Sequence, residues 1–314
     1  MDQRRLFRLL WLSIAAALAT ISLKTAAWAL TGSVGLLSDA AESLVNLAAA
    51  LFALAALRWA LKPADEEHAY GHAKAEYFSA GVEGALILVA AVAIAVTAVD
   101  RLIHPQPIES VGIGLAVSVL ASLINLAVGF LLLRTGRAER SITLEADGRH
   151  LMTDVWTSVG VVVGVAAVAI TGYDRLDALV ALAVAANIVR TGASLVRRSA
   201  GGLMDRGLGA GEQGEIDAVL SDFEHRSGVH FHALRTRQAG SRAFVSFHLL
   251  VPGEWSVQRG HDLAEEVEEA VRERLPYASV FTHLEPLEDP RSFADIALER
   301  DEEPPDGGAP SPRP

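Results

Sequence analysis

Four polar residues in otherwise apolar stretches of the chain have the types and the spacing of a metal site. His150 and Asp154 are four residues apart, so a helix stacks them on one face. Glu42 and Asn46 repeat this spacing in a second stretch. Two such helices can surround an ion with three oxygen ligands and one neutral imidazole nitrogen, which suits a divalent cation in tetrahedral geometry, Zn²⁺ first. Hydrogen bonds that join the two helices are the alternative interpretation.

The loop 63–74, with the sequence PADEEHAYGHAK, holds a carboxylate followed by two histidines. Asp65, His68 and His72 can converge on one cation within this short segment. Solvated loops often carry histidine and aspartate without a metal, so the spacing leaves both interpretations open.

Most of the ten histidines lie after residue 200. His232 and His248 fall on successive predicted strands, and His261 falls on a predicted helix. His283 shares the last predicted strand with Glu285. Because adjacent strands bring such side chains together, a metal site in which Glu285 bridges two ions is one interpretation. Scattered surface histidines are the other.

These residues belong to an unusually apolar chain. With 51% hydrophobic residues, 21% charged residues and a mean hydropathy of +0.31, its 314 residues do not have the composition of an ordinary soluble protein. A helix needs about 20 mostly apolar residues to cross a bilayer. The stretches that meet this length cover residues 6–30, 34–60, 77–103, 110–133, 143–171 and 175–197. The absence of cysteine excludes disulfide frameworks, thiolate metal sites and cysteine nucleophiles.

The charged residues predict the orientation and limit the partners. Basic residues precede the first stretch and follow the second, fourth and sixth, whereas the intervening loops are poor in positive charge. Because cytoplasmic loops carry an excess of Lys and Arg, both termini are predicted to be cytoplasmic, in a multi-pass protein of the inner (plasma) membrane lipid bilayer. The net charge of −11 comes from the last third of the chain and argues against nucleic acid as a partner.

The last third has the composition of a soluble domain. Its predicted elements, in the order αββαβ, are a helix over 212–226, strands over 229–238 and 242–251, a helix over 257–275 and a strand over 279–285. This order is typical of a small α+β domain with its helices on one face of the sheet.

The predicted fold class is therefore an α-helical membrane protein, with six transmembrane helices and a C-terminal cytoplasmic α+β domain. The expected domains are 1–200 for the transmembrane part, 201–289 for the cytoplasmic metal-binding and dimerisation part, and 290–314 for a disordered tail.

With these pieces in place, the chain resembles the cation diffusion facilitators, a family of proton-coupled exporters of divalent metals. Within that family it is similar to the bacterial branch that exports zinc and ferrous iron. The likeness is most specific in ADGRHLMTDVWTSVGV (146–161), in the loop PADEEHAYGHAKAE (63–76) and in HALRTR (232–237). It implies six spanning helices, a metallochaperone-like C-terminal domain, and a homodimer joined largely through that domain.

The resemblance also implies roles for individual residues. The transport site would consist of Glu42, Asn46, His150 and Asp154. The loop site would consist of Asp65, His68 and His72, and a cytoplasmic binuclear site of His232, His248, His261, His283 and Glu285. Lys74 and Asp205 would form a charge pair between subunits near the dimer interface.

The second-helix positions depart from the pattern of the family, which is usually Asp or His followed by Asp. Glu42 reaches about one methylene further than Asp, and Asn46 supplies an oxygen without a charge. Glu285 stands where a related site carries Asp. Zn²⁺ is expected first as substrate and as structural or regulatory ligand, with Fe²⁺, Co²⁺, Mn²⁺ and Cd²⁺ as alternatives.

The predicted function is export of a divalent metal from the cytoplasm in exchange for protons, by alternating access. An intramembrane metal-dependent hydrolase would need a general base and an open coordination position, and the sequence contains no HExxH-type helix, so no enzyme activity is expected. A membrane metal sensor or structural membrane protein that binds metal without transport is the alternative.

Overall fold

The computed structural model describes residues 3–31, 34–104, 113–173 and 175–293. The chain forms two compact units, Met1–Met204 and Asp205–Pro314, and each is described by itself.

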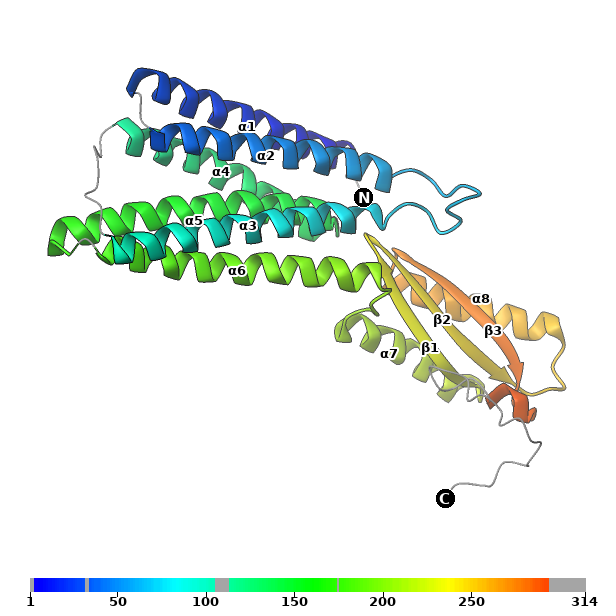
Figure 1. Cartoon of the computed structure of the whole chain (residues 1–314). Coiled ribbons are helices and arrows are strands. Elements are labelled where there is room, and N and C mark those ends of the chain that lie inside the picture. Colours follow the sequence, from blue (N-terminus) through cyan, green and yellow to red (C-terminus); the bar gives the residue numbers. More distant parts are fainter. Residues whose placement is uncertain (1–2, 32–33, 105–112, 174, 294–314) are drawn as a thin grey trace, which may run out of the picture. The chain divides into compact units, whose positions relative to one another are not determined.

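The first unit consists of long apolar helices that run side by side (Figure 1). They are α1 (Gln3–Thr31), α2 (Val34–Ala60), α3 (Ala75–Ile103), α4 (Ile113–Ala138), α5 (Ile142–Thr171) and α6 (Arg175–Leu203). Each of these six is long and apolar enough to cross a membrane, so the predicted six-helix architecture is confirmed. Helices α4 and α6 extend past the predicted ends at 133 and 197, because arginine is a good helix former and continues a helix as readily as it flanks one.

Helices α4 and α5 approach each other closely through glycines. A Cβ atom built on Gly148 of α5 would lie 3.0 Å from the carbonyl oxygen of Gly129 on α4. Small residues let helix backbones come together in this way within membranes. The close approach also brings the polar residues of these two helices within hydrogen-bonding reach, as the site below shows.

The second unit is a three-stranded sheet with two helices (Figure 1). Its elements are α7 (Ala210–Ser227), β1 (His230–Ala239), β2 (Arg242–Val251), α8 (Val257–Arg274), β3 (Ala278–Pro286) and the short 3-10 helix η1 (Pro290–Phe293). Strand β2 is central, antiparallel to β1 and parallel to β3. The predicted αββαβ order is therefore confirmed.

The core of this unit lies on one face of the sheet. Val245, Phe247 and Leu249 alternate along β2 and are fully buried against α7 and α8. Because successive side chains of a strand point to opposite faces, His248 lies on the face away from the two helices.

The segment that follows β3 is ordered as far as Phe293, whereas the sequence predicted a disordered tail from residue 290. Ser292 is buried and its hydroxyl donates to the carbonyl oxygen of Pro286. The carboxylate of Asp289 accepts hydrogen bonds from Arg291, which lowers the pKa of Asp289 to about 2. These bonds hold the turn in place, and residues 294–314 lie outside the described part.

Candidate metal sites

The helix that carries His150 and Asp154 is fixed at its start by a carboxylate from α3. Glu76 is buried and accepts hydrogen bonds from the hydroxyl of Ser141, at 2.5 Å, and from the backbone N–H of Thr143, at 3.2 Å. Acidic groups stabilise a helix N-terminus because they satisfy its free N–H groups. This contact sets the position of α5 against α3.

Two of the predicted transport-site helices meet through Asn46, which lies on α2. Its side-chain oxygen lies 2.7 Å from Nε2 of His150, and its amide nitrogen donates to Oδ2 of Asp154 at 2.6 Å. Asn46 and His150 are buried, with 8% and 6% of their surface exposed. The structure thus brings together three of the four predicted residues, by the hydrogen bonds that the alternative interpretation expected.

The hydrogen bonds of this group orient the Asn46 amide. Because its amide nitrogen faces Asp154, its carbonyl oxygen faces Nε2 of His150 and can only accept. A hydrogen bond at this contact uses the His150 form that has a proton on Nε2, whereas a metal ligand needs the lone pair of that nitrogen.

The remaining members of the group come from α2 and α4. Glu42 lies on α2 one turn before Asn46, and its side chain is outside the described part of the structure. Asn125 of α4 is buried and donates to the same carboxylate oxygen of Asp154, at 3.0 Å. Asn125 was not among the predicted site residues; its amide within an apolar stretch was the available signal.

The loop residues Asp65, His68 and His72 come together as predicted, with one possible ligand atom of each within 4.8 Å of the others. Nδ1 of His68 lies 3.2 Å from Oδ1 of Asp65, and Nε2 of His72 lies 3.4 Å from Oδ2. Nδ1 of the buried His72 is 3.2 Å from the carbonyl oxygen of Pro63 and donates to it. This bond leaves Nε2 with the lone pair that a metal needs.

A hydrogen bond from the backbone stabilises the ionised form of Asp65 in the loop group. The backbone N–H of His68 donates to its carboxylate at 2.8 Å, and this bond lowers the pKa of Asp65 below its usual value. Asp65 therefore stays ionised as the pH falls from neutral into the mildly acidic range. A carboxylate and two imidazoles fit a zinc-type cation.

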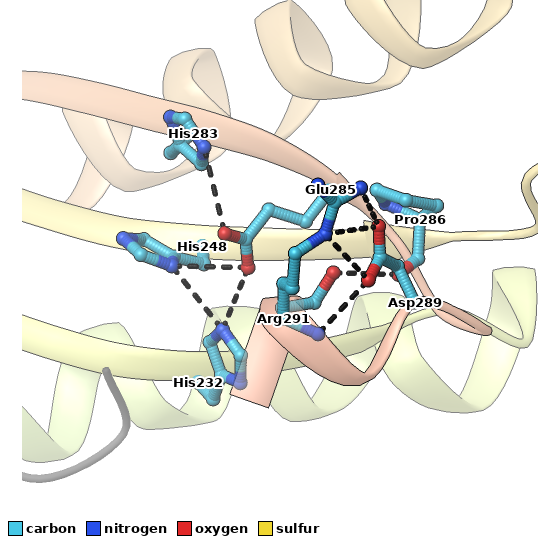
Figure 2. Close-up of polar contacts among 8 residues, drawn as sticks. His232, His248, His283, Glu285, Pro286, Asp289 and Arg291 are labelled. Atoms are coloured by element: carbon cyan, nitrogen blue, oxygen red, sulfur yellow. Dashed lines mark hydrogen bonds and ion pairs between the residues drawn. The ribbon is translucent and has the colours of Figure 1, made fainter. Parts of the chain in front are cut away.

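A row across the three strands, on the sheet face away from the helices, contains His232, His248, His283 and Glu285 (Figure 2). The register pairs His232 with His248 and His248 with His283. Oε2 of Glu285 lies 3.0 Å from Nε2 of His232 and 3.1 Å from Nδ1 of His248. Its other oxygen lies 3.5 Å from Nε2 of His283. The two oxygens of Glu285 thus serve different histidines, as a bridging carboxylate would.

The members of this row differ in exposure. The side chains of His232 and His248 are 10% and 20% exposed, whereas that of His283 is 67% exposed. The ring of Phe293, from η1, packs edge-on against His232 at 5.8 Å. His261 is exposed on α8, which covers the other face of the sheet, so a single chain does not bring it to this row.

The two residues of the predicted inter-subunit charge pair have partners within their own units. The ammonium of Lys74 donates to the carbonyl oxygen of Leu203 at 3.4 Å. Asp205 accepts a hydrogen bond from Arg237 at 3.1 Å. The pairing of Lys74 with Asp205 stays a prediction.

Comparison with known proteins extends over both units. Residues 10–204 match the cation efflux transmembrane domain, and residues 211–287 match the cytoplasmic domain of cation efflux proteins, a dimerisation domain. The chain is 54% identical over 282 residues to an uncharacterized transporter of Synechocystis sp., covering 90% of this chain and 91% of that protein. It is 36% identical over 274 residues to the cation-efflux pump FieF of Serratia proteamaculans, covering 87% and 90%. It is 33% identical over 272 residues to the FieF pump of Salmonella arizonae, also covering 87% and 90%.

Six helices long and apolar enough to cross a membrane, followed by a separate α+β domain, define a multi-pass membrane protein. The chain belongs to the cation efflux family, the cation diffusion facilitators, as the resemblance indicated. It is a cation efflux transporter, and its family is one of transporters rather than enzymes.

Proposed function

We propose that the protein exports a divalent transition metal from the cytoplasm in exchange for protons. Zn²⁺ is the first candidate, and Fe²⁺, Co²⁺, Mn²⁺ and Cd²⁺ are the alternatives. The observation that carries the proposal is the buried group in which Asn46 joins His150 to Asp154. An imidazole nitrogen with amide and carboxylate oxygens suits a borderline divalent cation. Glu42, one turn before Asn46, is the proposed fourth ligand.

Competition between metal and protons for the same side chains would couple their movements. Binding replaces the bond between His150 and Asn46, and a proton leaves His150 if its ring is doubly protonated before the metal binds, because ligation needs the unprotonated nitrogen. When the helices rock so that the group opens to the outer side, protons from that side return to His150 and the carboxylates and displace the metal. An inward proton gradient then drives metal outward.

The cytoplasmic row and the loop group are proposed as metal sites outside the transport path. His232, His248 and Glu285, with His283 at the edge, would bind metal from the cytoplasm when both termini lie on that side. The positive-inside distribution of arginine and lysine supports this orientation in the inner membrane. In a homodimer formed through the cytoplasmic domains, metal bound there would tighten the dimer, and Lys74 and Asp205 would pair between subunits.

A membrane metal sensor is the second candidate function, and the cytoplasmic row is the observation that favours it. Purified protein in vesicles, with an imposed pH gradient and several divalent metals in competition, separates the two functions. A transporter accumulates metal and dissipates the proton gradient, and its preference among the metals identifies the substrate. Metal binding without any flux would reject the transporter and support the sensor.

A further inference from the structure

Two buried acidic residues face the contact between α3 and α5, outside the metal-binding groups. Glu83 of α3 is completely buried, and Asp147 of α5 has 2% of its surface exposed. The two carboxyl groups interact electrostatically.

Each carboxyl group has one oxygen that is satisfied and one that is not. The hydroxyl of Ser79 donates to Oε1 of Glu83 at 3.5 Å, and Ser13 of α1 hydrogen-bonds the carboxyl of Asp147. Oε2 of Glu83 and Oδ2 of Asp147 are buried without a hydrogen-bond partner among the residues that the structure describes. A neutral acid that served only as structural glue would donate its O–H to an acceptor.

The charged groups near the pair come from α5 and α6. Asp147 lies within electrostatic range of His150 and Asp154 on its own helix. On α6, Val196 and Gly192 pack against α3 next to Glu83, and Arg198 of that helix is bound at 2.8 Å to Glu145. Burying two interacting carboxylates is costly when each has an oxygen that lacks a hydrogen-bond partner among the described residues, and this cost favours a pair that holds a proton.

We propose that Glu83, opposed by Asp147, is a proton-binding site of the transport cycle, separate from the metal ligands. This inference rests on the proposed function. A divalent cation held by His150 and Asp154, one to two helical turns from Asp147, favours the ionised pair and releases the proton. When the metal leaves, the two carboxyl groups again hold a proton between them. The site thereby adds one proton to those exchanged by the metal ligands.

The test uses Glu83→Gln, which keeps the size of the side chain and cannot ionise. Asp100→Asn is the matched control, because Asp100 is an exposed acid at the far end of the same helix. Each protein is placed in vesicles, and two quantities are measured: metal–metal exchange without a pH gradient, and steady-state metal accumulation with a gradient of about one pH unit. Each coupled proton contributes one factor of the proton ratio, so losing one lowers the accumulation about tenfold at this gradient.

We expect Glu83→Gln to keep metal–metal exchange and to lose about tenfold in accumulation, with fewer protons released per metal. Asp100→Asn should match the wild type in both. If Glu83→Gln accumulates metal and releases protons as the wild type does, the inference is wrong while the proposed function stands. If the wild type itself moves no metal, the proposed function is wrong.

A second variant keeps the test decisive if Glu83→Gln does not fold. Asp147→Asn removes the charge that opposes Glu83, so the pH at which accumulation is half-maximal should shift. An unchanged pH profile in a folded Asp147→Asn protein would overturn the inference.

Discussion

The membrane group and the cytoplasmic row contain similar donor types, but they are built in different ways. In the membrane, Asn46 and Asn125, on two different helices, both donate hydrogen bonds to Asp154 on a third helix. On the sheet, the register of adjacent strands sets the histidines around Glu285, and His283 is largely exposed. A metal that enters the membrane group must replace internal hydrogen bonds, and these bonds re-form when it leaves. A metal can reach the edge of the sheet without any helix movement. We infer that the first group suits passage and the second suits sensing.

The largest effect is expected from removing a membrane ligand. His150→Ala or Asp154→Ala should lower metal flux at least about 100-fold, because even second-sphere partners of metal ligands are worth about 10–100-fold. The cytoplasmic row is on the other unit, so metal binding there should persist. Flux in vesicles and binding by titration calorimetry on the same preparation check this. Near-normal flux in either variant would reject the membrane group as the path.

The reverse pattern is expected for the row on the sheet. His248→Ala should lower metal affinity of the cytoplasmic sites about 10–100-fold and weaken the metal-dependent tightening of the dimer. Flux should continue at a reduced rate, since the path through the membrane is intact. His225→Ala, at an exposed histidine on α7 outside the row, is the control. If His248→Ala binds metal as the wild type does, the row on the sheet is not a metal site.

Asn46→Asp should make the membrane group more like a site with two carboxylates on α2. The added charge should tighten divalent binding about tenfold at neutral pH, after the cost of losing another proton and of opposing Asp154 at 2.6 Å is subtracted. More protons should be released per metal bound. Calorimetry in buffers of different ionisation enthalpy measures both quantities. If neither changes, Asn46 is not a ligand.

A smaller effect is expected from replacing Asn125, whose uncharged side-chain amide donates a hydrogen bond to the carboxylate of Asp154. Asn125→Ala should lower flux about tenfold, because a hydrogen bond to a charged group contributes about 1.5 kcal/mol. Asn187→Ala, the equivalent amide-to-methyl change on α6, should leave flux near that of the wild type. Equal effects of the two substitutions would show that Asn125 has no special role beside Asp154.

The sequence was sufficient for the elements and for placing several of the predicted site residues on shared faces, because both depend on local periodicity. A spacing of four placed His150 and Asp154 on one face, and strand alternation placed His232 and His248 together. The contact of Asn125 with Asp154 depends on the close approach of α4 and α5, which spacing within one helix does not contain. Likewise, the order of Pro290–Phe293 depends on the buried Ser292, since its composition alone resembles a disordered tail.

The central claim is that the membrane group itself binds the exported metal. The most direct measurement is the amount of zinc retained by a variant without the other sites, in which His68, His72, His232, His248 and His283 are all replaced by alanine. We predict one zinc per chain at neutral pH, bound through nitrogen and oxygen by X-ray absorption, and lost when Asp154→Asn is added. The claim would be contradicted if the variant retained no zinc. It would also be contradicted if the zinc stayed bound after Asp154→Asn was added.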